Sequence, residues 1–393
     1  MARPTTPLTH PEDAAPRQGF IAHWLAALRA MLRDQGVLML VVGGPLFYSF
    51  FYPWFYSAQV VQRVPVAIVV PEADGLTRQL LRYADASAQL AVNLVTADAQ
   101  QARQALLRGD IYGYAELPRG LKRSVLRREP VHVTVYAHGS YPLVSKQVQQ
   151  GFAQSFGTVA AGVQLKRLQA GGQSAPQAAA SRAPLQLHSA ALFNPTGGYG
   201  SFVVAAVALL ILQQTLLMGI AMLVATWREQ QRAAASAGAW LARLLAFCLP
   251  GWLAGLYYFG WMFVWHDYPS GGNPLGALAL LGLFVPAVVG CAALLGLWVA
   301  DRERVLYLVL FTSLPLAFLA GFTWPAEALP PWLEWLRWAS PSTAAIQASL
   351  RLNQLGAPLA AALGPLAVLA AIALLGWLAT LLAGSRQRPP APQ

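Results

Sequence analysis

Six long apolar stretches constrain this chain more than any other feature of its sequence. None of them contains Asp, Glu, Lys, Arg or His. They cover residues 36–57, 201–226, 244–265, 277–300, 305–323 and 359–383. A helix that crosses a bilayer needs about 20 apolar residues, and buried helices of soluble proteins rarely run so long without a charge. The sequence therefore predicts a mainly α-helical membrane protein with six transmembrane helices.

The distribution of basic residues predicts how these helices are oriented. The net charge is +11, but charged residues make up only 11% of the chain, against about 25% in a typical soluble domain. If the N-terminus is cytoplasmic, the cytoplasmic segments hold eleven arginines and the short outer segments 266–276 and 324–358 hold two. This bias follows the positive-inside rule, which does not count long segments such as 58–200. Both termini are therefore predicted to be cytoplasmic, and a nucleic-acid partner is not expected.

The N-terminal region precedes the first span. Residues 1–17 are rich in Pro and Thr and are predicted to be disordered. Residues 18–34 have the apolar stripe of an amphipathic helix, with Arg29 and Arg33 off the stripe, and are predicted to lie in the cytoplasmic interface. The alternative is a plain helical extension of the first span. Because about 35 residues precede that span and no small-x-small cleavage site follows it, it is interpreted as a signal anchor.

Residues 58–200 form the one long polar segment between spans and are predicted to be an extracytoplasmic α/β domain. Strands are expected at 64–70, 90–95, 111–116 and 131–136, since they are β-branched or alternate in polarity. Helices are expected at 75–86, 98–107, 117–128 and 140–169. Strands that alternate with helices favour a small α/β fold. The stretch 171–183 is predicted to be flexible.

The segment 324–358 is too polar to span the bilayer and too apolar for a free loop. Tryptophan favours the headgroup level, and proline interrupts helices. We expect short interfacial or re-entrant helices on the outer face; the alternative is an aromatic belt on an ordinary loop. The residues that indicate this region are Trp324, Pro325, Trp332, Trp335, Trp338 and Pro341.

The sequence indicates no catalytic, nucleotide-binding or metal-binding site. No lysine follows a glycine, so the chain has no Walker-A phosphate loop of its own. The six histidines and the two cysteines, Cys248 and Cys291, show no metal-ligand spacing, and no G-x-S-x-G elbow occurs. We therefore predict no catalytic, cofactor-binding or metal-binding residues, and a chain that is not itself an enzyme.

The spans also argue against an ion-coupled carrier, because such carriers usually need an ionisable group in mid-membrane. The most polar mid-span residues are Gln213, Gln214 and Thr215, which are candidates for lining a substrate path. The alternative is that they hydrogen-bond neighbouring helices together. Gly251 and Gly255 form a GxxxG motif that suggests close packing, either within the chain or against a second subunit.

Several motifs match a known arrangement in order and spacing. Residues 28–34 form a basic connector that ends in Arg-Asp, residues 66–70 open the external domain, and residues 106–118 give a helix, glycine, strand and proline. Residues 193–195 match the motif that precedes the second span, and residues 322–356 match the re-entrant region at the outer face. From about residue 18 to 385 the chain resembles the permease subunits of type-2 ABC exporters that have a large external domain. It departs after Arg228-Glu229, where the Gly-Thr of the family is absent.

The resemblance implies ATP-driven export from the bacterial inner membrane, with a separate ABC ATPase subunit that binds ATP and Mg²⁺. It also implies a second permease chain, identical or paralogous, and a periplasmic adaptor is a further candidate partner. The apolar spans favour a hydrophobic or amphiphilic substrate. The rivals are a non-transporting envelope assembly protein and, third, a membrane-bound enzyme. The candidates for ATPase coupling are Arg29, Arg33, Asp34, Trp227, Arg228, Glu229, Arg232, Asp301, Arg302, Glu303 and Arg304.

The predicted division of the chain follows from these elements. A cytoplasmic tail and connector helix precede the first span, the external domain follows, and the remaining spans lead to a cytoplasmic tail. The predicted bounds are 1–35, 36–57, 58–200, 201–385 and 386–393.

Overall fold

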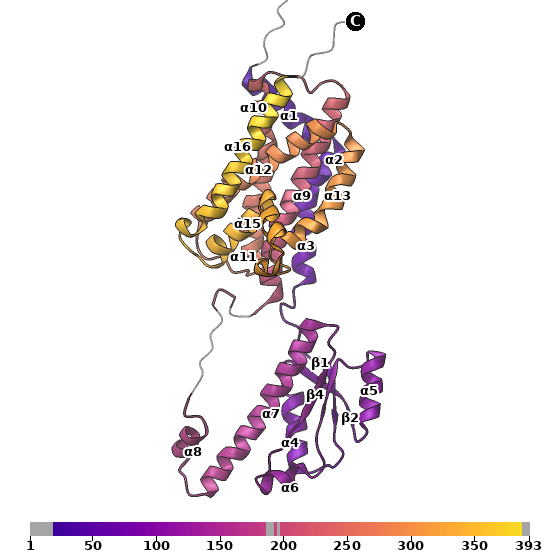
Figure 1. Ribbon diagram of the computed structural model, residues 1–393, viewed down its shortest axis with the longest axis vertical. Helices are drawn as coiled ribbons and strands as arrows, with labels where there is room; N and C mark the ends of the chain where they lie inside the picture. The colour runs from indigo at the N-terminus through magenta and orange to yellow at the C-terminus, as the bar shows by residue number, and fades with distance from the viewer. Residues whose placement is uncertain (1–18, 186–191, 195–196, 387–393) are drawn as a thin grey trace, which may run out of the picture. The chain divides into compact units, whose positions relative to one another are not determined.

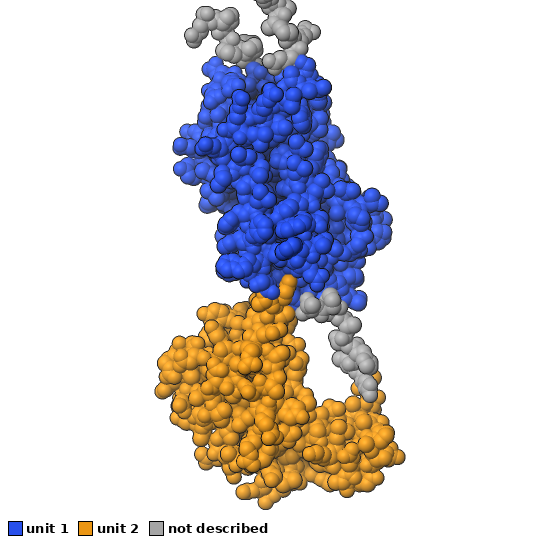
Figure 2. All heavy atoms as spheres, turned by 180° about the vertical axis from the view of Figure 1, so that it is seen from behind, with its two compact units in different colours: residues 1–57, 191–393 blue, residues 58–190 orange. Residues whose placement is uncertain are grey.

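A computed structural model describes residues 19–185, 192–194 and 197–386 (Figure 1). The predicted disordered segment 1–17 and nearly all of the C-terminal tail lie outside the described residues. The chain divides into two compact units (Figure 2). Unit 1 combines residues 1–57 with 191–393, and unit 2 comprises residues 58–190.

Unit 1 is helical. In the described part of the chain, five helical segments are long and apolar enough to cross a membrane, and they coincide with five of the six predicted spans. They are Gln35–Phe55 (which includes α2, Gln35–Leu38, and α3, Gly44–Phe55), Tyr199–Glu229 (α9), Ala237–Trp265 (α10, Ala237–Leu256, and α11, Phe263–Trp265), Pro274–Val299 (α12) and Leu359–Ser385 (including α16, Leu363–Ser385). The predicted amphipathic connector forms α1 (Phe20–Arg33), which packs against α10.

The predicted span 305–323 forms α13 (Arg302–Leu319), which is not among those five segments. Its first turn holds three charged residues, Arg302, Glu303 and Arg304, so its apolar part begins at Val305. About 15 residues at a rise of 1.5 Å extend roughly 22 Å, less than the ~30 Å hydrocarbon core of a bilayer. The count of six spans therefore stays a prediction.

Small residues let the long helices of unit 1 approach closely. A Cβ on Gly296 of α12 would lie 2.5 Å from the carbonyl oxygen of Ala221 in α9. On the other side of α12, Gly290 and Gly376 of α16 place the two backbones against each other. The GxxxG motif of α10 also packs within the chain, because a Cβ on Gly255 would meet Leu281 of α12.

Replacement of Gly296 by valine is expected to destabilise the helix bundle. The branched side chain would collide with the Ala221 carbonyl, a backbone atom that cannot move without shifting α9. Overpacking of this kind costs about 1–3 kcal/mol or more. The apparent Tm of the purified protein should fall, whereas Gly282→Val in the same helix should change it little, because nothing lies within 4 Å of a Cβ at that position. Equal Tm values for the two variants would contradict the packing.

Unit 2 contains a four-stranded sheet with helices on both faces, as expected for a mixed sheet that is mainly parallel. The strand order is β2-β1-β3-β4, with β1 parallel to β2 and β3, and β4 antiparallel to β3. Alternate residues of β1 enter two cores: Val66 and Ile68 join Phe152 of α7, and Ala67 and Val69 join α5. The elements are β1 (Val64–Val69), α4 (Gly75–Asp85), β2 (Leu90–Thr96), α5 (Ala99–Arg108), β3 (Gly113–Glu116), α6 (Leu121–Leu126), β4 (Thr134–Ala137), α7 (Pro142–Ala170) and α8 (Ala175–Arg182).

The prediction that residues 171–183 are flexible was wrong for most of this stretch, since it contains α8. The helix begins with a capping box. The Ser174 hydroxyl accepts a hydrogen bond from the backbone N–H of Gln177 (3.5 Å), and the Gln177 side-chain oxygen accepts one from the backbone N–H of Ser174 (3.1 Å). Such a cap satisfies helix N–H groups that would otherwise have no partner. The alanine-rich sequence that follows has high helix propensity, and this propensity was underestimated.

The segment 324–358 contains the predicted short helices, and their interfacial or re-entrant position on the outer face stays a prediction. They include α14 (Pro331–Leu336) and α15 (Pro341–Ser349), and each begins at a proline, whose fixed φ suits the first helical position. Trp324, Trp332 and Trp335 are exposed, whereas α15 is almost wholly buried against α9, α12 and α16.

Candidate functional site

Four residues from three separate parts of the sequence meet at one end of unit 1, and we call this cluster the Arg302 junction. Arg302 binds Asp34 with both ends of its guanidinium group, Nη1 to Oδ2 at 2.5 Å and Nη2 to Oδ1 at 2.8 Å. Arg302 Nη1 also donates to the Thr226 hydroxyl at 3.2 Å. The backbone N–H of Arg302 donates to Glu229 Oε1 at 2.8 Å. The junction thus joins the α1–α2 corner, the end of α9 and the start of α13.

Asp34 is held in place by the corner that it forms. It separates α1 from α2 in extended conformation and caps α2, since its Oδ1 accepts from the Val37 N–H at 3.1 Å. A Cβ on Gly36 would lie 2.9 Å from Arg302 Nη2, so the glycine leaves the space that the guanidinium group occupies. The Arg-Asp end of the connector therefore has a definite structural use, as an N-cap and as an ion-pair partner.

The start of α13 is fixed by two carboxylates. Asp301 caps the helix by accepting from the Arg304 N–H at 2.9 Å, and Glu229 accepts from the Arg302 N–H. Both N–H groups lack a partner inside the helix, and negative charge at a helix N-terminus is favourable. The polar turn between α12 and α13 is therefore attached to the end of α9.

The ion pair of the Arg302 junction is partly protected from water. The side chains of Arg302 and Asp34 are 29% and 21% exposed. Hydrogen bonds from the Arg302 guanidinium group hold the pKa of the Asp34 carboxyl below its usual value. A lowered carboxyl pKa stabilises the folded state above the unfolded pKa, and this contribution is lost as the pH falls through the lowered value. The ion pair is therefore fully formed at neutral and mildly acidic pH.

A second arrangement beside the junction holds the loop between α9 and α10. The guanidinium group of Arg243 lies between two indole rings, 4.8 Å from the centroid of Trp227 and 4.9 Å from that of Trp240. Its Nη1 donates to the Ala233 carbonyl at 3.2 Å. Stacking of an arginine on aromatic rings is favourable, and more so away from water. Trp227 is accordingly buried and fixes the loop to the helices.

The remaining coupling candidates are exposed. These residues lie on α1, on α13, and at or just after the end of α9, and none of them joins the Arg302 junction; in the described part of the chain Arg304 pairs with Asp301 at 3.2 Å. They are Arg29, Arg33, Arg228, Arg232, Glu303 and Arg304. Their net charge is positive, so this end of unit 1 presents a mainly basic surface.

The three polar mid-span residues of α9 have different environments. Gln213 is buried, donates to the Ser340 hydroxyl at 3.3 Å and accepts from the Ser342 N–H at 2.5 Å, so it hydrogen-bonds α9 to the start of α15. Thr215 donates to the Ile211 carbonyl at 2.9 Å within its own helix. Both amide atoms of Gln214 are buried and have no hydrogen-bond partner among the described residues. Gln213 therefore fits the alternative prediction, in which these polar residues hydrogen-bond neighbouring helices together.

Two structural contacts at this end of unit 1 had no clear signal in the sequence. Thr226 was not a candidate, because threonine near a span end is common and usually unremarkable. Arg243 is one of the eleven arginines that set the predicted orientation. The spacing of Trp240 and Arg243, three apart on one helix, does place both side chains on the same face and could have indicated the stacking.

The long apolar helices define the class of this chain as a multi-pass membrane protein. Comparison with protein families then places it more narrowly. The family described as ABC-2 family transporter protein matches residues 36–382, most of the chain. The chain belongs to this family, as its resemblance to type-2 ABC permeases indicated, and membership implies an ABC ATPase partner in general. A comparison with curated proteins found no match.

Proposed function

We propose that this chain is the permease subunit of an ATP-driven exporter of a hydrophobic or amphiphilic substrate. A separate ABC ATPase, which binds ATP and Mg²⁺, would dock on the basic surface around the Arg302 junction, and two permease chains would form the pathway. One observation carries this proposal: Arg302 joins α2, α9 and α13, which are distant in sequence. A push on any of these segments would move the others as a rigid body.

The proposal is tested by finding the ATPase. Affinity purification of the chain under mild detergent should recover a protein with a Walker-A motif, and the complex should hydrolyse ATP and move substrate in proteoliposomes. The permease chain alone should bind no nucleotide, since its sequence has no phosphate loop. Stoichiometric ATP binding by the isolated chain would contradict the division of labour between two subunits.

The topology belongs to the same proposal. We infer six spans including α13, cytoplasmic termini, an inner-membrane location and an extracytoplasmic unit 2, because eleven arginines against two favour this orientation. In a variant without Cys248 and Cys291, cysteines at Gln100 and Ser270 should react with an impermeant maleimide in cells with a permeable outer membrane. A cysteine at Arg232 should react only after the inner membrane is opened. Labelling of the cysteine at position 232 in intact cells would contradict the predicted orientation.

Arg228 is the best single residue for testing the docking surface. Glu229 already bonds to Arg302, whereas Arg228 is exposed and makes no ion pair within the described residues. Arg228→Glu should insert normally yet reduce export and substrate-stimulated ATPase activity at least about tenfold, since like charges at an interface cost several kcal/mol. Arg386→Glu, also at an exposed helix end, is the matched control and should be nearly silent. If the Arg228→Glu protein transported at the wild-type rate, Arg228 would not belong to the docking surface and would only mark where α9 leaves the membrane.

A further inference from the structure

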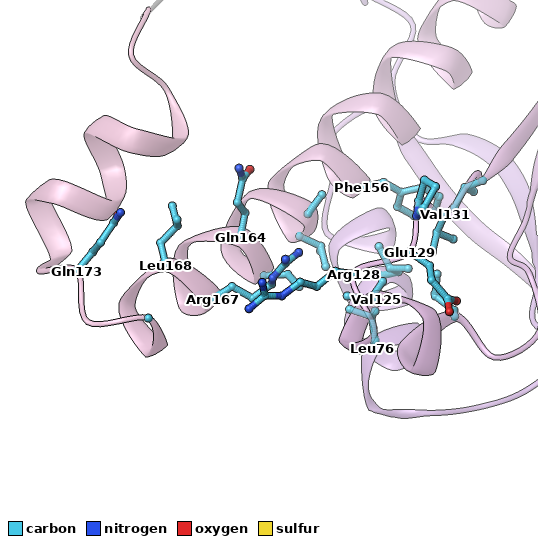
Figure 3. Close-up of a pocket in the computed structure, with 18 residues that line it drawn as sticks. Leu76, Val125, Arg128, Glu129, Val131, Phe156, Gln164, Arg167, Leu168 and Gln173 are labelled. Atoms are coloured by element: carbon cyan, nitrogen blue, oxygen red, sulfur yellow. The ribbon is translucent and has the colours of Figure 1, made fainter.

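Unit 2 contains a pocket that the proposed transport function does not explain. Its volume is about 780 Å³, within the range of roughly 300–1,000 Å³ that ligand pockets occupy. Residues from α4, α6, α7 and the 128–133 segment line it (Figure 3). Most of the lining residues are apolar, among them Leu76, Leu80, Val125, Phe156 and Val163. A pocket of this size and lining suits an alkyl chain.

Two arginines give the pocket a charged end. Arg128 and Arg167 line it, and neither forms an ion pair with any residue that the structure describes. Figure 3 shows both side chains reaching toward the same end. Glu129 also lines the pocket, and its carboxylate is turned away from the two arginines (Figure 3). Gln164, one turn before Arg167 on α7, adds an amide to the lining. The apolar walls and the basic end together match an amphiphile with an anionic head.

The backbone at Arg128 places its side chain at the pocket. Arg128 follows the end of α6 with φ +64°, in the left-handed region. Its N–H bonds to the Val125 carbonyl (3.2 Å), and the next N–H, of Glu129, bonds to the Ser124 carbonyl (3.0 Å). Glycine is the usual residue at this position of a helix end, because a side chain is disfavoured there. The arginine is therefore held at the pocket despite an unfavourable backbone conformation.

We propose that this pocket binds a single-chain amphiphile with a carboxylate or phosphate head. The alkyl chain lies along the apolar wall, and the head accepts charge-assisted hydrogen bonds from Arg128 and Arg167, which suit planar and tetrahedral oxyanions. The inference concerns binding to unit 2 and does not depend on whether the chain exports anything.

Binding is measured on the full chain held in a non-ionic amphipol, with dansyl-labelled undecanoic acid as the probe. We expect a saturable rise in dansyl fluorescence, with one site per chain. Dodecanoate and dodecyl phosphate should each displace the probe, and their relative potency distinguishes a fatty acid from a lipid phosphate. Dodecanol and dodecyltrimethylammonium should displace it at least tenfold more weakly. Equal displacement by the cationic compound, or a rise that does not saturate, would overturn the proposal.

Two pairs of variants locate the site. Arg128→Gln with Arg167→Gln should weaken probe binding by about tenfold or more, because two hydrogen bonds to a charged group are lost. The matched control removes two nearby charges outside the pocket lining, Arg123→Gln with Lys166→Gln, and should bind as the wild type does.

The apolar half of the pocket is tested by filling it. Ala160 lines the pocket from the exposed side of α7, so Ala160→Trp should fill it and abolish saturable binding without disturbing the core. Ala153→Trp, on an exposed position of the same helix outside the lining, is the control. Unfolding is excluded by an unchanged apparent Tm. Unaltered binding by a folded Ala160→Trp protein would show that the probe binds elsewhere.

Discussion

Replacement of Arg302 by glutamate is expected to abolish export while leaving membrane insertion intact. The substitution removes both hydrogen bonds to Asp34 and the one to Thr226, and it places a second carboxylate beside the first. A hydrogen bond to a charged group contributes about 1.5–3 kcal/mol, and like charges in contact add repulsion. The α1–α2 corner should separate from α13. We expect transport to fall at least about a hundredfold in proteoliposomes that contain equal amounts of protein.

The control is Arg386→Glu, which reverses an exposed arginine at another helix end. Arg386 forms no ion pair among the described residues, so an effect of general charge would appear there too. A charge swap isolates the pair: Asp34→Arg combined with Arg302→Asp should regain part of the transport that either single variant loses. All of these variants keep the backbone N–H that donates to Glu229 in the native protein. Wild-type transport by the Arg302→Glu protein would exclude the junction from coupling.

The spans were predictable because the bilayer imposes one simple rule. Every long uncharged stretch must be helical in lipid, so the absence of charge located five helices directly. The stretch 305–323 shows where that rule ends. Its apolar run is terminated by the break at Gly321, with φ +82°, and its first turn is charged. Length and hydropathy leave such a helix undecided, and its packing against α9 is not visible in the local sequence.

The sequence indicated which residues are charged at the helix ends but not how they pair. Asp34, Glu229 and Arg302 were all predicted as contacts for a partner protein, yet the structure joins them to one another. Residues 34 and 302 are brought together only by the packing of α2 and α13 against α9. No local pattern carries that information. The exposed arginines, which local charge does indicate, remain the candidates for the docking surface.

The same distinction applies to the polar residues of α9, where neighbouring glutamines serve as test and control. Gln213→Leu should detach the start of α15 from α9, because the buried Ser342 N–H loses its acceptor. A buried donor left without a partner costs about 1–3 kcal/mol. We expect a lower apparent Tm and a loss of transport of at least tenfold, since α15 would no longer keep a fixed position against the longest buried helix.

Gln214→Leu is expected to behave differently, although it is the same substitution one residue away. The Gln214 amide atoms have no hydrogen-bond partner among the described residues, so their removal relieves an unfavourable burial and the Tm should be unchanged or higher. Transport then separates two roles. If Gln214 lines the substrate path, transport falls or changes specificity at full stability; if it only fills space, transport is unaffected. An unchanged Tm with Gln213→Leu would contradict the hydrogen bonding that anchors α15. A fall in Tm with Gln214→Leu would contradict the unfavourable burial of the Gln214 amide.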